Sequence, residues 1–293
     1  MTRQTVTRFA PSPNGLLHLG HAFAALQAWR AAKVENGRFL LRIEDIDTTR
    51  CQPEFDAAIR EDLTWLGFDW DGLVRRQSEH LDDYANALAQ LDEAGLIYPC
   101  FCTRAAIRAE IARAGAAPHL SAEAAEPIYP GTCRPLVASE RADRMALGLP
   151  FALRLDMRSA VARAGPLDWH DRLKGRITAR PGRFGDIVIA RKETPASYHL
   201  AASLDDHLQG VTLVTRGEDL FEATHIHRLL QALLGLDTPD YAHHRLITDP
   251  SGRRLAKRDK ALTLAALRAR GVSRIAIAAA LDAGTIENLA RSN

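Results

Sequence analysis

Residues 3–21 read RQTVTRFAPSPNGLLHLGH, and this stretch has the pattern of a strand that turns directly into a helix. Residues 3–10 predict a short strand. The next five residues, PSPNG, hold two prolines and an Asn-Gly pair, which are typical turn residues. An Ala- and Leu-rich stretch from about His18 to Ala32 then predicts a helix.

The same alternation of strand and helix continues toward the C-terminus. Residues 38–45 (RFLLRIED) follow a break at Gly37 and predict a buried strand that ends in acidic residues. Helices are predicted over residues 53–66, with proline at the start, and over residues 78–94, where Gly95 ends the pattern. This order predicts an α/β fold with a Rossmann-like parallel sheet.

The pattern changes between about residues 99 and 183, where Cys-x-Cys, YPGTC and short segments cut by Gly and Pro indicate an α+β insertion. Strand patterns return at DIVIARK (186–192) and VTLVTRGED (211–219), and residues 222–234 predict a helix. We therefore predict a nucleotide-binding domain (1–98 and 184–246), an insertion (99–183) and a short helical C-terminal segment (247–293).

The composition limits the class of protein. With 293 residues, the chain is long enough for one large domain or a domain plus an insertion. Hydrophobic residues make up 46% and charged residues 25%, and the net charge of +2 creates no strong field toward nucleic acid. We find no signal peptide and no apolar run of the ~20 residues that a spanning helix needs, so we expect a cytoplasmic protein without a membrane partner.

The first chemical motif is His18-Leu-Gly20-His21, at the start of the predicted helix. A helix start offers N–H groups and the positive end of the dipole to a phosphate. The two imidazoles, three residues apart, lie on one helical face and can donate to the same phosphate. The absence of a side chain at Gly20 lets a flat base lie close to the backbone. The alternative is a capped helix with two solvent-facing histidines.

The second motif is a basic loop, residues 252–258, with the sequence GRRLAKR. A glycine-hinged basic loop near the end of the sheet suits a mobile clamp on a triphosphate. In isolation, the segment would be interpreted as a solvated basic turn rather than as a clamp.

Together and in this order, the two motifs resemble the paired signatures of class I aminoacyl-tRNA synthetases, most closely those of the glutamyl-tRNA synthetases. The resemblance covers nearly the whole chain. Other blocks match that family in the same order: Arg8-Phe-Ala-Pro-Ser12-Pro-Asn-Gly, Leu41-Arg-Ile-Glu44-Asp-Ile-Asp47 with Arg50, Tyr198, and Thr215-Arg216-Gly-Glu-Asp219. One departure is Ala256, where the family usually has serine before its lysine, which puts one phosphate contact in doubt.

The chain ends at Asn293, whereas full-length glutamyl-tRNA synthetases continue into a helical domain that reads the anticodon. We expect no anticodon-binding domain here. The layout resembles a truncated group of the family that attaches glutamate to queuosine, a modified base at the wobble position of tRNA(Asp). The resemblance implies tRNA-independent activation of L-glutamate with ATP, then transfer to the cyclopentenediol of queuosine in that anticodon loop. We expect a monomer.

Three alternatives remain open at this point. A short glutamyl-tRNA synthetase would charge a tRNA 3′ end, and a separate anticodon-binding chain would favour it. A non-catalytic paralogue that senses glutamate or nucleotide would be favoured by loss of the histidines or the lysine, but His18, His21 and Lys257 are all present. A small nucleotidyltransferase would share only the two nucleotide motifs, and the glutamate blocks argue against it.

Free glutamate has two carboxylates and an ammonium, so a site for it needs cations and an anion. The resemblance assigns Arg8 and Arg216 to the carboxylates, through bidentate guanidinium pairing. It assigns Glu44 to the amine, with hydroxyls from Ser12 and Tyr198. The neutral amide of glutamine would leave a buried guanidinium uncompensated, at a cost of several kcal/mol. An internal salt bridge is the alternative role for Arg8 and Glu44.

Adenylation would use positive groups aimed at the charge that develops on the phosphates. His18, His21 and the helix start would serve the α-phosphate of ATP, with Gly20 beside the nucleotide. Lys257 would serve the leaving phosphates. Mg²⁺ would arrive with the ATP and needs no dedicated protein cage.

Cys100, Cys102 and Cys133 form a third group. In a chain without an export signal they indicate a metal site or free thiols before disulfides. Two close thiolates and a distant third suit one structural, tetrahedral Zn²⁺. The family pattern gives Tyr129 as the fourth ligand, whereas His119 is the better ligand chemically. Three unpaired thiols are the alternative to a metal site.

Overall fold

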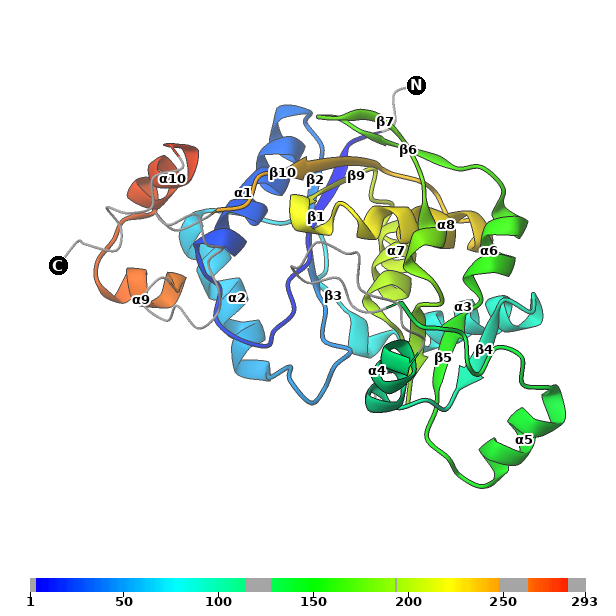
Figure 1. Cartoon of the computed structure of the whole chain (residues 1–293). Coiled ribbons are helices and arrows are strands. Elements are labelled where there is room, and N and C mark those ends of the chain that lie inside the picture. The colour runs from blue at the N-terminus through cyan, green and yellow to red at the C-terminus, as the bar shows by residue number, and fades with distance from the viewer. Residues whose placement is uncertain (1–3, 114–127, 193, 248–262, 284–293) are drawn as a thin grey trace.

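The computed structural model describes residues 4–113, 128–192, 194–247 and 263–283. A parallel sheet has the order β1-β2-β3, from β1 (Val6–Phe9), β2 (Arg38–Ile43) and β3 (Arg75–Arg76). A second sheet has the order β9-β10-β6-β7, from β9 (Leu213–Gly217), β10 (Asp240–His244), β6 (Asp168–Asp171) and β7 (Gly175–Thr178). Only β7 is antiparallel to its neighbour. The Thr212 N–H donates to the Val6 carbonyl over 2.9 Å, so β9 runs beside β1 (Figure 1).

Helices cover both faces of the layer that these two adjacent sheets form (Figure 1). Helices α1 (Leu19–Val34) and α2 (Pro53–Leu66) pack on β1 and β2, and α9 (Leu264–Ala269) and α10 (Arg274–Ala283) join the same apolar cluster. Helices α3 (Leu81–Glu93), α6 (Met157–Ala164), α7 (Tyr198–Leu208) and α8 (Ala223–Leu234) form a second cluster. Short 3₁₀ turns lie at Gln77–Glu79, Pro181–Phe184 and Glu218–Leu220.

The alternation of side chains along β2 explains how one strand serves both faces. Phe39, Leu41 and Ile43 are buried in the cluster with α1 and α2. Arg42, between them in sequence, points to the opposite face and reaches Asp206 on α7. Because side chains of a strand alternate with a period of two, one strand supplies both an apolar core and a charged group.

A third, antiparallel sheet has the order β4-β5-β8, from β4 (Ile97–Cys100), β5 (Ala152–Leu155) and β8 (Val188–Arg191). Helices α4 (Arg104–Arg113) and α5 (Ala138–Ala146) lie between β4 and β5 in sequence, and α5 stands out from the body in Figure 1. Strands β6 and β7 come from within the predicted insertion, but they belong to the second sheet, with β9 and β10. Strand β8 comes from outside the predicted insertion, but it belongs to the third sheet. The domain boundaries stay a prediction.

The predicted fold class is confirmed: a parallel α/β sheet, an α+β stretch between its two halves, and a short helical C-terminal segment. That segment returns to the first motif, since Thr263 pairs with His18 and the Leu264 N–H donates to the Leu17 carbonyl over 2.8 Å. Among the described residues, no helix has the length and apolar character needed to cross a membrane.

Candidate active site

A cleft of about 500 Å³ opens where β1, β2 and β9 reach their carboxyl ends, the edge at which open α/β sheets bind ligands. Every predicted catalytic, glutamate-binding or ATP-binding residue that the structure describes lines this cleft. These residues are Arg8, Ser12, His18, Gly20, His21, Glu44, Tyr198 and Arg216. The predicted Lys257 and its neighbour Ala256 lie outside the described residues.

His18 and His21 build the N-terminus of α1. His18 is the N-cap residue, and its Nδ1 accepts the Gly20 N–H over 3.0 Å. The Nδ1 of His21 accepts the backbone N–H of His18 over 3.2 Å, and the two ring centroids are 3.9 Å apart. Because each Nδ1 is an acceptor, a neutral ring has its proton on Nε2, which is then a donor. The first turn has no acidic residue, so the helix end keeps its positive character.

Gly20 makes this cap possible. A Cβ at this position would lie 2.9 Å from Cε1 and 3.1 Å from Nδ1 of the His18 ring, which is too close for the ring to stay folded back on the helix. The sequence pattern indicated a different reason for the glycine, the close approach of a flat base. Both reasons follow from the missing side chain, and Gly20 does line the cleft.

The part of the cleft beside α1 is the less polar one. Phe23 and Ala24 line it from the helix, and Leu246 and Ile247 line it from the segment after β10. These apolar side chains suit a flat, largely apolar group. Charged residues also line the cleft: Arg8 on β1, Glu44 after β2, Arg216 on β9, Asp219, and Arg245 directly before Leu246.

Four charged residues form the Arg8–Arg42 cluster: Arg8 and Glu44, which line the cleft, and Arg42 and Asp206, which contact them. Arg8 Nε and Arg42 Nη1 donate to the same Asp206 oxygen, over 2.9 and 2.8 Å. Arg42 Nη2 donates to Glu44 Oε1 over 3.2 Å. Both Arg8 and Glu44 therefore make internal ion pairs, each with a partner that the sequence analysis had not named.

Burial and pairing act against each other on the pKa values of this cluster. Burial alone would lower the pKa of Arg42, but the carboxylates of Asp206 and Glu44 outweigh it and raise the pKa. Burial would raise the pKa of Asp206, but Arg8 and Arg42 hold it below its ordinary value. For Glu44 burial prevails over the pull of Arg42, so its pKa is raised. At full ionisation, the two arginines and two carboxylates of the cluster have no net charge. Asp205, which also lies 3.8 Å from Arg42 Nε, pairs with Arg75.

Arg216, at the end of β9, is surrounded by neutral acceptors. Its Nε donates to His243 Nε2 over 3.2 Å, and its Nη2 donates to Thr224 Oγ1 over 2.6 Å. Its Nη1 contacts both the Tyr198 hydroxyl and His227 Nδ1, each at 3.2 Å. No carboxylate of the described residues forms an ion pair with it, although the side chain is 5% exposed. The cleft thus contains one buried cation without an internal counterion in the described part of the chain.

Both histidines beside Arg216 stay neutral near pH 7. Burial, and then the charge of Arg216, lower the pKa of His243 to about 4, although Asp171 raises it. Burial and Arg216 also place the pKa of His227 well below its ordinary range. The His243 Nδ1 lies 2.6 Å from Asp171 Oδ2, and a carboxylate only accepts, so Nδ1 has the proton and Nε2 offers its lone pair to Arg216.

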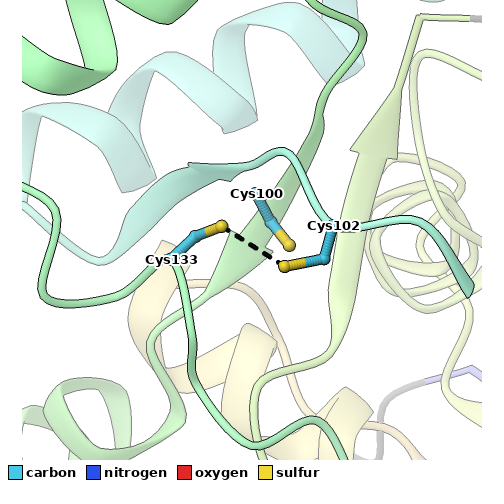
Figure 2. Close-up of side chains that lie close together, drawn as sticks. All are labelled: Cys100, Cys102 and Cys133. Atoms are coloured by element: carbon cyan, nitrogen blue, oxygen red, sulfur yellow. Dashed lines mark hydrogen bonds between the residues drawn. The ribbon is translucent and has the colours of Figure 1, made fainter. Parts of the chain in front are cut away.

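The three predicted cysteine ligands come together away from the cleft. Figure 2 shows the thiols of Cys100, Cys102 and Cys133 pointing toward one another, and their sulfurs lie within 4.8 Å. Cys102 and Cys133 are 3.5 Å apart, close to the separation of two sulfurs on a tetrahedral ion with Zn–S bonds of ~2.3 Å. The geometry and the soft ligand set fit a single zinc ion.

Of the two candidates for the fourth zinc ligand, Tyr129 is among the described residues and His119 is not. The Tyr129 hydroxyl is 3.6 Å from Cys102 Sγ and accepts the Cys133 N–H over 2.8 Å, so it lies at the open side of the three sulfurs. The guanidinium of Arg154 stacks 3.9 Å from the centre of its ring. His119 lies outside the described residues.

The sequence analysis missed several residues that shape the cleft: Arg42, Asp171, Asp206, Thr224, His227 and His243. Two signals were available. Arg42 is a charged residue inside a buried strand pattern, and Asp206 belongs to an acidic pair in an otherwise apolar helix. Both are typical of a charge that has a buried partner.

Comparison with known proteins agrees with this geometry. Residues 4–286 match the family described as tRNA synthetases class I (E and Q), catalytic domain. The chain therefore belongs to this class I family, whose members are ATP-dependent ligases. Two solved glutamate–tRNA synthetases, from Elizabethkingia anophelis and Elizabethkingia meningosepticum, share 31% and 30% identity with TM-scores of 0.74 and 0.72. The chain covers only 53% and 52% of their lengths, and 88% of it is matched in each case.

Within the family, the chain is similar to proteins named glutamyl-Q tRNA(Asp) synthetase. The relative from Rhodobacter capsulatus is 49% identical over 275 residues, which is 92% of this chain and 96% of that protein. The relative from Nocardia farcinica is 45% identical over 260 residues, 88% of this chain and 77% of that protein.

Proposed function

We propose that this chain activates glutamate with ATP in the absence of RNA and then transfers the glutamyl group to the cyclopentenediol of queuosine in tRNA(Asp). The observation that carries the first half is the uncompensated charge of Arg216. Glutamate with both carboxylates ionised has a net charge of −1, which matches one buried cation. Glutamine has no net charge and would leave Arg216 without a counterion, at a cost of several kcal/mol.

The charge distribution suggests which carboxylate goes where. Arg216 and Tyr198 bind the side-chain carboxylate, the group that distinguishes glutamate from glutamine. Arg8 already pairs with Asp206, so it adds positive potential without giving up that bond. Glu44 uses one oxygen for Arg42 and offers the other to the ammonium group. Ser12 lies at the mouth of the same cleft and supplies a hydroxyl.

The adenylation step follows from the position of α1. An oxygen of the α-carboxylate attacks the α-phosphorus of ATP, and pyrophosphate leaves with the electrons of the broken P–O bond. The Nε2–H groups of His18 and His21 and the helix N-terminus stabilise the charge on the α-phosphate. The adenine lies in the less polar part of the cleft beside Gly20, and Lys257 serves the leaving phosphates. Mg²⁺ accompanies the nucleotide and offsets phosphate charge when bound.

Activation without RNA is supported by how the cleft is held together. Arg8, Arg42 and Asp206 fix one another, and Arg216 is fixed by residues of α7, α8 and β10. These contacts lie within the described chain, so assembly of the glutamate site needs no contact from RNA. Exchange of pyrophosphate into ATP should therefore occur with glutamate alone. Exchange that requires tRNA would reject this part of the proposal.

The second half concerns the acceptor. A hydroxyl of the cyclopentenediol attacks the glutamyl carbonyl carbon, AMP leaves, and a general base takes the hydroxyl proton, which yields an ester. The names of the relatives and the match to nearly the full length of the Rhodobacter capsulatus protein support queuosine as the acceptor. The match to two glutamate–tRNA synthetases supports the competing acceptor, a 3′-terminal ribose.

One experiment separates the two acceptors. The enzyme is incubated with ATP, labelled glutamate and tRNA(Asp) that contains either queuosine or guanine at the wobble position. Label on the queuosine form alone, stable to removal of the 3′ end, is the expected result. Equal labelling of both forms, or label lost with the 3′ end, would favour 3′ charging.

We also propose one structural zinc ion, held by Cys100, Cys102 and Cys133 with Tyr129 as fourth ligand. Bound zinc would join β4 to the segment before α5. Since none of its ligands lines the cleft, we assign it no part in adenylation. Elemental analysis should find about one zinc per chain. Tyr129→Phe should speed metal loss to a chelator, with His119→Ala as the comparison. Metal-free protein with three titratable thiols would contradict the site.

A further inference from the structure

Arg216 differs from two other deeply buried arginines, Arg8 in the cleft and Arg42 beside it, in the chemical type of its partners. Arg8 and Arg42 donate to carboxylates, which is the usual way to bury a guanidinium. Arg216 donates to two imidazoles and two hydroxyls instead. A carboxylate at any of these places would give Arg216 a permanent counterion.

The hydrogen bonds leave room for one ligand. Four of the five N–H groups of Arg216 have partners among the described residues, so within them one N–H of Nη2 remains for a ligand. The Tyr198 hydroxyl accepts from Arg216 and therefore keeps its own proton for donation. Tyr198 and Arg216 both line the cleft, so a carboxylate there can accept from both.

The two imidazoles are held so that each offers a lone pair to Arg216. Asp171 fixes the tautomer of His243, and its Oδ1 accepts the backbone N–H groups of Leu173 and Lys174, over 2.8 and 3.0 Å. Asp171 therefore has hydrogen-bond partners of its own, and the His243 ring separates its negative charge from Arg216. His227 accepts at Nδ1, which places its proton on Nε2, and this atom is buried with no hydrogen-bond partner among the residues that the structure describes. A buried, unpaired N–H costs ~1–3 kcal/mol, so His227 sits there against a local penalty.

We propose that His227 and His243 are specificity-determining residues that solvate Arg216 with neutral acceptors and so keep its charge available for the side-chain carboxylate of glutamate. The proposal deepens the glutamate site described above and rests on it. His227 is the residue to test, because glutamate is close to it in size and would add a carboxylate next to Arg216, where the described residues place none. That carboxylate would pair with Arg216 and remove the reason to prefer an anionic substrate.

The test compares His227→Glu with His227→Gln, whose amide oxygen is a neutral acceptor. Binding of glutamate and of glutamine is measured by calorimetry, and activation by pyrophosphate exchange. His227→Glu should weaken glutamate binding on the order of 100-fold and shift the glutamate-to-glutamine ratio toward glutamine. His227→Gln should lose less than about tenfold and keep its preference for glutamate.

A matched control lies two residues away on the same helix. His225 is also buried, but it contacts Trp169 and lies near Arg180 and Arg183, whose charges help to lower the pKa of its imidazole after burial. His225→Glu therefore adds a buried carboxylate near other cations and should leave the substrate ratio as it is in the wild type. Circular dichroism and melting temperature establish that each variant folds.

The outcomes separate this inference from the proposed function. If wild-type protein binds glutamate and His227→Glu discriminates as strongly as His227→Gln, the role of the neutral acceptors is wrong while the glutamate site stands. If His225→Glu changes the ratio as much as His227→Glu, the effect is general and the inference also fails. If wild-type protein binds no glutamate, both the proposed function and this inference fail. Should His227→Glu not fold, Thr224→Asp, which puts the carboxylate beside Nη2, gives the same comparison.

Discussion

Arg8 and Arg216 enter the same cleft from neighbouring strands, and each is 5% exposed. Arg8 shares Asp206 with Arg42, so its charge is neutralised within the fold. Arg216 has histidine, tyrosine and threonine partners, and its charge has no counterion in the described residues. The comparison indicates that one arginine mainly organises the fold and the other mainly serves a ligand. Substitutions at the two positions should therefore affect different quantities.

The largest effect should come from Arg216→Gln. Removal of the cation for the side-chain carboxylate should lower kcat/KM for glutamate in pyrophosphate exchange by about 1,000-fold, the cost of losing a buried charge pair with the substrate. The free energy of unfolding should stay the same or rise, because an uncompensated buried charge is removed. A large loss of stability would show that Arg216 is structural, and the comparison with Arg8 would break.

Lys257→Ala should come next and should act on the nucleotide alone. Loss of one transition-state donor should reduce kcat of exchange by a factor of about 100 to 1,000. The ratio of activity with glutamate to activity with glutamine should not change, in contrast to Arg216→Gln. A changed ratio would mean that the charge of Lys257 also contributes to the choice of amino acid.

Arg8→Gln should instead be a stability variant. It leaves Asp206 buried with one arginine fewer, which should lower the free energy of unfolding by about 3 kcal/mol. The double variant with Asp206→Asn should recover part of this loss, because the unpaired carboxylate is then gone. Chemical denaturation measures both values. An unchanged denaturation midpoint in Arg8→Gln would show that Arg8, like Arg216, is not required for the stability of the fold.

The smallest expected effect is a difference in pH dependence. The pKa of His243 is about 4 in the folded protein and ~6.5 in an unfolded chain, so between these values the unfolded state binds a proton that the folded state does not. The free energy of unfolding should thus fall as the pH is lowered through this window, by about 2 kcal/mol at pH 5 for this one group. His243→Gln should flatten the profile by that amount.

Asp206 should respond to acid later than His243. The pKa of Asp206 is lowered in the fold, so its contribution is complete above ~3.9 and is lost only as the pH falls further, toward its folded value. Unfolding measured from pH 7 down to about pH 3 tests this order. A profile that His243→Gln leaves unchanged would show that other groups cause the acid sensitivity.

Much of the fold followed from local patterns. The strand at residues 6–9, the helix α1 and the strand β2 lie where the sequence predicts them, because turn residues and apolar runs mark their ends. Helix α7 and strand β10 were not predicted. Strand β10 reads DYAHH, and its His243 is buried against Asp171 and Arg216, which are remote in sequence.

The candidate site shows the same limit. Motif resemblance named Arg8 and Arg216 as equivalent cations, and both do line the cleft. It could not reveal that they differ in electrostatic state, because that depends on which side chains α7, α8 and β10 place around each guanidinium. Local pattern can locate a charge, but its compensation depends on contacts between segments that are distant in sequence.

The hairpin of β6 and β7 has a consequence for engineering. Asp171, at the end of β6, orients His243 and through it Arg216, although β6 comes from the stretch between the two halves of the main sheet. This stretch is therefore not an exchangeable cassette. A chimera that replaced residues 99–183 as a block would change the amino-acid pocket even if every residue lining the cleft were retained. Replacing only the residues between β4 and β5 should leave the amino-acid pocket unchanged, because the contacts of His243 with Asp171 and Arg216 would remain.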